Sequence, residues 1–173
     1  MRCPSCDADI NDDHPACPGC RFHISQLDPI LGPVPPKARL LDRAGLIDKR
    51  DRSRLLERID LLASRAGVEL CVVTLETSAP RKPSEWAFWL FDRWQVGGPG
   101  HEGVLVLLSR QERRIESEVG WGVEQAISDE ASTALLGAHA VPFFRQGRWG
   151  EGLLQAVDVL AQLIERARRE VRR

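Results

Sequence analysis

The chain has 173 residues, of which 43% are hydrophobic and 28% charged, and its formal net charge is −1. This length and apolar share suit one globular domain with a small appendage. The near-neutral balance lacks the excess of lysine and arginine that marks a nucleic-acid binder, so no nucleic-acid partner is expected.

The apolar stretches are short, and the N-terminus is polar and rich in cysteine. The longest apolar runs are residues 86–91 and 104–108, well below the roughly 18 to 20 residues of a membrane-spanning helix. The N-terminus also lacks the apolar segment of a signal peptide. We therefore expect a cytoplasmic protein without a membrane span, whose clustered cysteines stay reduced and bind metal.

Two C-x2-C motifs open the chain: Cys3, Cys6, Cys17 and Cys20. Each motif can direct two sulfurs at one ion, so together they predict a structural site of the zinc-ribbon type over residues 1–26. Four ligands leave no open coordination position for catalysis. Zinc is the preferred metal, and iron bound by the same sulfurs stays an alternative. His14 and His23 flank the second motif and are interpreted as surface residues.

The charge of this ribbon indicates what it can bind. Residues 1–31 contain two arginines against five aspartates, and four thiolates on a divalent ion add further negative charge. Such a surface repels phosphates. We therefore expect the ribbon to contact another protein.

A proline-rich segment follows the ribbon. Seven of the eleven prolines lie in the first 36 residues. Because proline lacks an amide proton and restricts the residue before it, residues 27–39 are interpreted as a semi-rigid, extended linker. The main domain is expected over residues 40–169.

Helical and strand patterns alternate from residue 48 onward. A helical apolar stripe ends at Gly67, and residues 68–76 then read as a buried strand with Cys71 as a core residue. Residues 83–94 open with proline and space their tryptophans along one helical face. This pattern predicts a helix that packs on a sheet.

Two further strands are close together in the sequence. Residues 103–109 are apolar, and residues 113–120 alternate apolar with charged side chains. Only residues 111–112 and their immediate neighbours separate the two strands. This spacing predicts an antiparallel hairpin.

Two helices close the domain. Ser128 is the expected cap of a helix that begins at Asp129, and Pro142 is expected to bend or end it. Residues 148–169 carry another apolar stripe. Helices before, between and after three strands predict an α/β fold class, a mixed-sheet α/β sandwich, preceded by the zinc-ribbon head.

Six segments in this order resemble the TPM domain, a family that includes thylakoid-lumen proteins linked to photosystem repair. They are LLDRAGLI (40–47), FDRW (91–94), GGPGHEGVLVLLS (97–109), EVGWGVE (118–124), ISD (127–129) and VPFFRQGRWGEGL (141–153). The resemblance implies a helix-flanked sheet with a cleft at one edge. It also implies acid phosphatase activity, divalent-cation binding, or an accessory role in a membrane complex.

The resemblance also implies which residues line the cleft. It aims Asp42, Glu124 and Asp129 at one place, where carboxylate oxygens would suit Ca²⁺ or Mg²⁺. Many members carry an aspartate and then an arginine in the hairpin, and Glu112 followed by Arg113 takes that place here.

Two functions follow from these features. The preferred one is a protein-binding or assembly module, with Trp121 and Trp149 as candidate partner contacts. The alternative is a phosphatase-like hydrolase of the acid phosphatase type, in which a carboxylate-held metal polarises the phosphoryl group and Arg93 or Arg113 clamps it. The sequence leaves catalytic activity open, because no catalytic constellation is complete.

Two glycines flank Trp121. Gly120 and Gly122 are expected to permit unusual backbone angles and a close approach where the hairpin strand leaves the sheet.

Overall fold

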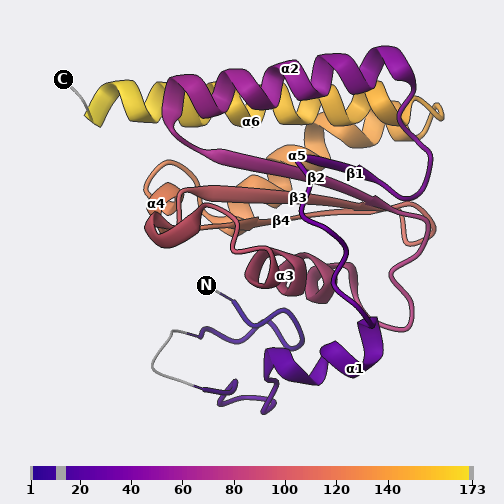
Figure 1. Ribbon diagram of the computed structural model, residues 1–173, viewed down its shortest axis with the longest axis vertical. Helices are drawn as coiled ribbons and strands as arrows, with labels where there is room; N and C mark the ends of the chain where they lie inside the picture. Colours follow the sequence, from indigo (N-terminus) through magenta and orange to yellow (C-terminus); the bar gives the residue numbers. More distant parts are fainter. Residues whose placement is uncertain (1, 11–14, 172–173) are drawn as a thin grey trace.

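The computed structural model describes residues 2–10 and 15–171 of the chain. A sheet with the strand order β1-β2-β3-β4 lies between two layers of helices, as Figure 1 shows. Its strands are Leu40–Asp42 (β1), Glu69–Leu75 (β2), Gly103–Ser109 (β3) and Arg114–Val119 (β4). The first three run parallel, and β4 runs antiparallel to β3. This mixed sheet between helices confirms the predicted α/β sandwich.

The hairpin of β3 and β4 has the expected place and direction, with Val104 opposite Val119. The short β1 is an addition to the predicted strands. Its three residues are too few to give a periodic signal. They form a strand because they pair with β2, where Leu40 lies opposite Val72, and such tertiary pairing overrides local preference.

Three helices cover one face of the sheet (Figure 1). They are α2 (Lys49–Ala66), α5 (Asp129–Phe144) and α6 (Trp149–Val171). Asp48 caps the start of α2, and Gly67 ends it in the left-handed region with φ 69°. Ser128 caps α5 as predicted, and Pro142 lies in the last turn of that helix. Within the described chain, no helix combines the length and apolarity needed to cross a membrane.

Helix α3 (Pro83–Arg93) and the N-terminal segment lie on the other face (Figure 1). Trp89 and Leu90 of α3 are fully buried in a hydrophobic cluster that includes Cys71 and Leu105 of the sheet. The same cluster contains four residues of the N-terminal segment, namely Cys3, Cys17, Phe22 and Leu27. The cysteine-rich head and the main domain therefore share one core.

Residues 27–39, expected as an extended linker, begin instead with a short helix that packs on α3. This helix is α1 (Asp28–Leu31), preceded by a 3-10 turn at Ile24–Gln26. Proline is compatible with the first turn of a helix because that turn needs no N–H donor. The carboxylate of Asp28 accepts hydrogen bonds from Trp89 Nε1 (2.7 Å) and from the guanidinium of Arg93 (3.0 and 2.8 Å). These contacts anchor the segment.

The packing of this segment predicts a stability effect for Leu27→Ala. Leu27 is 0% exposed, so its truncation should lower the free energy of unfolding by about 2 kcal/mol, at the low end for a buried leucine because the nearby head can relax. Ile30→Ala is the matched control, since Ile30 is 45% exposed and should have little effect. Urea unfolding measures both. Equal free energies of unfolding for the two variants would contradict the claim that Leu27 anchors the segment.

Candidate functional site

The sulfurs of the four head cysteines form one cluster, in which all four atoms lie within 4.8 Å of one another. The distance from Cys3 Sγ to Cys20 Sγ is 3.7 Å, and from Cys6 Sγ to Cys17 Sγ it is 3.6 Å. A tetrahedral zinc ion about 2.3 Å from each sulfur would separate the sulfurs by about 3.8 Å. The four cysteines therefore have the spacing to hold a metal ion.

The two C-x2-C motifs fold into the same turn. The N–H of Cys3 donates to the carbonyl of Ala8, and the N–H of Cys17 donates to that of Phe22, both at 2.8 Å. Asp7 and Arg21 take the same place in each turn with φ 66° and φ 61°. Two copies of one turn face each other, which brings all four sulfurs together.

His23 does not join the sulfur cluster. His14 lies outside the described residues. His23 precedes the 3-10 turn at Ile24–Gln26, and its Nδ1 accepts the backbone N–H of Ser25 (3.2 Å). The ligand set in the described chain is therefore sulfur alone.

Backbone hydrogen bonds and burial shift the pKa values of two of the thiols in opposite directions. The N–H groups of Cys20 and Gly19 outweigh burial and lower the pKa of Cys17 to about 7, whereas burial raises the pKa of Cys3 to about 12. A metal ion binds thiolates and would displace these protons.

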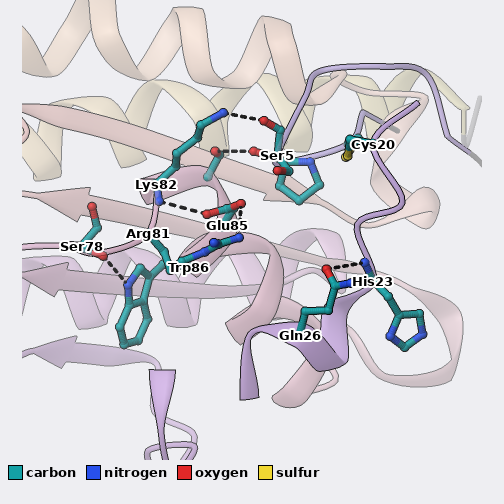
Figure 2. A network of polar contacts seen from close by, with 12 residues as sticks. Ser5, Cys20, His23, Gln26, Ser78, Arg81, Lys82, Glu85 and Trp86 are labelled. Atoms are coloured by element: carbon teal, nitrogen blue, oxygen red, sulfur yellow. Dashed lines mark hydrogen bonds and ion pairs between the residues drawn. The ribbon is translucent and has the colours of Figure 1, made fainter. Parts of the chain in front are cut away.

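The start of α3 holds the first cysteine turn in place, as Figure 2 shows. Lys82 Nζ donates to the carbonyl of Ser5, and Ser84 Oγ donates to the carbonyl of Pro4 (3.0 Å). Glu85, only 3% exposed, accepts from the guanidinium of Arg81 (2.7 Å) and from the N–H of Lys82 (3.1 Å). The first turn of α3 therefore both fixes its own geometry and positions the cysteines.

An acidic groove of about 1030 Å³ lies between the head, α3, β4 and α5. Its acidic lining residues are Asp7, Glu112, Glu116, Glu118, Asp129 and Glu130. Its basic lining residues are Arg2, Lys82 and Arg114. An ion pair closes one side, where Arg2 Nε lies 2.8 Å from Glu130 Oε1. The walls of the groove thus come from both the head and the main domain.

Asp129 lies in the first turn of α5 and hydrogen-bonds to β4. Its Oδ1 accepts the backbone N–H of Val119 (2.6 Å), and Thr133 Oγ1 accepts that of Ser117 (3.3 Å) in the same strand. Burial raises the pKa of Asp129 to about 6, although the hydrogen bond from Val119 opposes the shift. The carboxylate therefore has a structural partner.

Glu116 and Glu118 project from β4 into the groove. Burial raises the pKa of Glu118 well above its usual range, and the neighbouring charges of Asp129 and Glu116 raise it further. Burial also raises the pKa of Glu116. Sequence motifs do not single out these two residues. The alternation of apolar and charged side chains in residues 113–120 could have indicated them, because it assigns Glu116 and Glu118 to the same face of the strand.

Glu112, at the turn between β3 and β4, is held by the protein itself. Its carboxylate accepts from the hydroxyl of Thr77 (2.7 Å), the N–H of Ser78 (3.2 Å) and the hydroxyl of Ser109. Burial opposes ionisation of Glu112, but these donors lower its pKa to about 2. Glu112 is ionised and already hydrogen-bonded.

Asp42 lies at the opposite edge of the sheet from β4. Its carboxylate accepts the N–H groups of Leu46 (3.1 Å) and Ile47 (3.0 Å) and the hydroxyl of Thr74. Glu124 is in the short helix α4 (Trp121–Glu124), which follows the C-terminal end of β4. Because β4 runs antiparallel to the other strands, this end lies beside the start of β3, whereas Asp42 is the last residue of β1.

The four acidic candidates therefore do not converge. Glu112 and Asp129 line the groove, whereas Asp42 and Glu124 do not. Among the described residues, the four cysteines are the sole group of histidine, cysteine or carboxylate side chains close enough to share an ion. The expected convergence fails because the resemblance gives the order of the acids in the sequence but not the strand edges to which they belong.

The two candidate tryptophans lie at opposite ends of α6. Trp121 is 42% exposed and faces the ring of His101, with the centroids 5.1 Å apart. Near it, the guanidinium of Arg168 in the last turns of α6 donates to the carbonyl of Gly122. Trp149 begins α6 and stacks on Phe144 (4.9 Å). No single surface presents both tryptophans.

The raised pKa of Asp129 predicts the effect of Asp129→Asn. The pKa of Asp129 is about 6 in the folded chain, against an ordinary value of 3.8. Folding stability from this group is therefore full below about pH 4 and is lost as the pH rises through about 6. The variant should flatten that part of the stability profile, measured by urea unfolding from pH 3 to 7.

Glu130→Gln is the control for this measurement. The pKa of Glu130 is lowered, chiefly by backbone and side-chain hydrogen bonds, so its contribution is present at neutral pH and is lost as the pH falls. The two substitutions should change the profile in opposite senses. A profile of Asp129→Asn that parallels the wild type would contradict the assignment.

The main domain belongs to the class of α/β sandwiches with a mixed sheet and helices on both faces. Residues 40–163 match the family model described as the TPM domain. The chain is therefore a member of the TPM domain family. No curated protein matches it.

Several solved structures are similar to the chain. The N-terminal domain of a protein from P. gingivalis is 28% identical, with a TM-score of 0.68, over 72% of this chain and 80% of that one. The N-terminal domain of cg2496 protein from Corynebacterium glutamicum is 17% identical, with a TM-score of 0.59, over 76% and 82%. BA42 protein from Bizionia argentinensis is 14% identical, with a TM-score of 0.61, over 72% and 86%. The last two likenesses concern the fold alone.

Proposed function

We propose that the chain is a cytoplasmic protein-binding or assembly module. In it a zinc ribbon (1–26) and a TPM domain (40–169) are joined by residues 27–39 and grip one partner together. The observation that carries this proposal is the groove between the two parts, whose walls include head residues and β4. A surface built from the head and the main domain suits a partner that contacts both parts at once.

Zinc is the proposed metal of the head, and its role is structural. Four sulfurs at tetrahedral spacing complete the coordination of zinc and leave no position for a substrate. A weak Ca²⁺ or Mg²⁺ site is a secondary part of the proposal. It would use Asp129 with oxygen atoms of water or of a partner, since no three acidic side chains of the described chain lie close enough to share an ion.

Co-purification tests the module. The tagged full-length chain should retain a specific protein at fixed stoichiometry. Arg114→Glu, which reverses a charge in the groove, should reduce that retention more than Arg145→Glu on the exposed end of α5. The proposal fails if the chain runs as a lone monomer and retains nothing specific.

A phosphatase-like activity is the second candidate, and one observation favours it. Arg114 and Lys82 line the same groove as Asp129, so cationic groups and a carboxylate face one space. Arg93 is not available as a phosphate clamp, because its guanidinium is bound to Asp28 (2.8 Å) and Asp92 (2.6 Å). An aryl phosphate, assayed with and without Ca²⁺ or Mg²⁺, should be cleaved and Asp129→Asn should stop it. Absence of turnover in the wild type ends this reading.

A further inference from the structure

A second, smaller pocket of about 190 Å³ lies beside the groove, between α3, the loop before β3 and the start of α4. Four rings line it, namely Phe88, Phe91, His101 and Trp121. Phe88 and Phe91 come from α3, and Trp121 opens α4. Aromatic faces therefore surround the pocket from two sides.

Carboxylates complete the lining of this aromatic pocket. Glu118 of β4 lines both the pocket and the groove. Among the described residues, no hydrogen bond or ion pair reaches its carboxylate. Asp92 also lines the pocket, and its carboxylate is 2.6 Å from Arg93 NH1. Glu118 is therefore a carboxyl group without a partner in the described protein. Burial raises its pKa, and a cation that enters the pocket would favour its ionised form.

The backbone around Trp121 is tightly placed, so the pocket is preformed. A methyl group on Gly122 would lie 2.6 Å from the carbonyl oxygen of Gly100. His101 has φ 51°, an uncommon left-handed conformation for a residue other than glycine. Arg168 ties α4 to this loop, because its guanidinium contacts both Glu102 and the carbonyl of Gly122. Two rings are thus held at the pocket by contacts that need no ligand.

We propose that this pocket binds an arginine side chain of a partner protein. Aromatic faces attract cations, and the attraction grows when water is excluded. The planar, weakly hydrated guanidinium stacks on rings better than an ammonium does, and Glu118 offers a charge partner. The inference rests on the proposed binding function and identifies the partner chemistry that Trp121 would recognise.

A peptide titration tests the pocket. A fluorescent peptide of alternating glycine and arginine is titrated into the metal-loaded chain. The same peptide with citrulline in place of arginine keeps the planar shape but removes the charge and exchanges one NH2 donor for a carbonyl oxygen. The arginine peptide should bind and shift the indole N–H signal that Trp121→Phe removes from the NMR spectrum. The citrulline peptide should bind about tenfold more weakly, because cation–π and charge contributions of about 1.4 kcal/mol are lost.

Matched variants distinguish binding in the pocket from nonspecific attraction by the acidic groove. Glu118→Gln and Trp121→Ala should each weaken the arginine peptide about tenfold, and Trp121→Phe should keep most of the affinity. Glu116→Gln is the control, because Glu116 lies on the same face of β4 and lines the groove but not the pocket. It should change the affinity by less than about twofold.

The results have distinct readings once near-UV circular dichroism has verified that each variant is folded. Equal binding of the citrulline peptide, or equal losses in Glu116→Gln and Glu118→Gln, overturns the arginine pocket. A partner that co-purifies equally with wild type and Trp121→Ala overturns the pocket while the assembly module stands. Binding of the arginine peptide by a chain that retains no protein supports the pocket chemistry while the module fails.

Discussion

Replacing Cys17 with serine should release the metal and detach the head from α3. The Cys17 side chain is buried, and its sulfur is one of the four that lie within 4.8 Å of one another. Binding of a structural zinc ion contributes on the order of 10 kcal/mol to folding of such a small unit. Mass spectrometry should find about one zinc per wild-type chain and almost none in the variant.

The fifth cysteine provides the control. Cys71 is fully buried in β2, away from the sulfur cluster, so Cys71→Ala should keep the metal and lose a modest amount of stability. Limited proteolysis should cut the head of the Cys17 variant first, because Cys17 and Leu27 belong to one hydrophobic cluster with α3. Wild-type metal content in Cys17→Ser contradicts the four-sulfur site, and visible absorption of the wild type would identify iron in place of zinc.

Gly120→Ala should be the most damaging substitution of a glycine in the hairpin region. An added methyl carbon would lie 2.1 Å from the carbonyl oxygen of His101, a backbone atom that cannot swing aside. The strand end or the loop must move, which should cost about 3 kcal/mol of unfolding free energy. Denaturant unfolding measures the loss.

Gly137→Ala in α5 makes the same chemical change in open space. No atom lies within 4 Å of the added carbon, and alanine is the better helix former, so stability should rise by about 0.5 to 1 kcal/mol. Opposite signs for the two variants are the expected result. A Gly120→Ala variant as stable as the wild type would mean that the close approach is not maintained in solution.

The structure confirms one of the two roles predicted for Gly120. The close approach is present, whereas the backbone angles are ordinary, since the φ of Gly120 is −72°.

Local patterns of residues specify most of the main domain. The apolar stripe that ends at Gly67 and the short spacing of the hairpin both act within a few residues, so the sequence predicts α2 and the β3–β4 pair. The docking of the N-terminal segment has no such local signature. It depends on contacts such as those of Asp28 with Trp89 and Arg93, which join distant parts of the chain.

The residues of the candidate site also fall into those that local sequence predicts and those that only the fold brings together. Cysteine spacing is a local signal, and it predicts the sulfur cluster in full. The carboxylates gave only their order along the chain, so the sequence could not separate Asp42 at one sheet edge from Asp129 at the other. The ring of His101 beside Trp121 also required the structure, because a loop between two elements brings them together.

The hydrogen bonds from β4 to α5 limit how any partner can join this protein. β4 is the last strand of the sheet, yet the amides of Ser117 and Val119 are already taken by Thr133 and Asp129. An incoming strand would find these donors occupied and could not extend the sheet there without displacing the first turns of α5. These contacts therefore protect the edge strand from pairing with other chains. A partner that binds at this edge must be recognised by side chains instead of by backbone pairing.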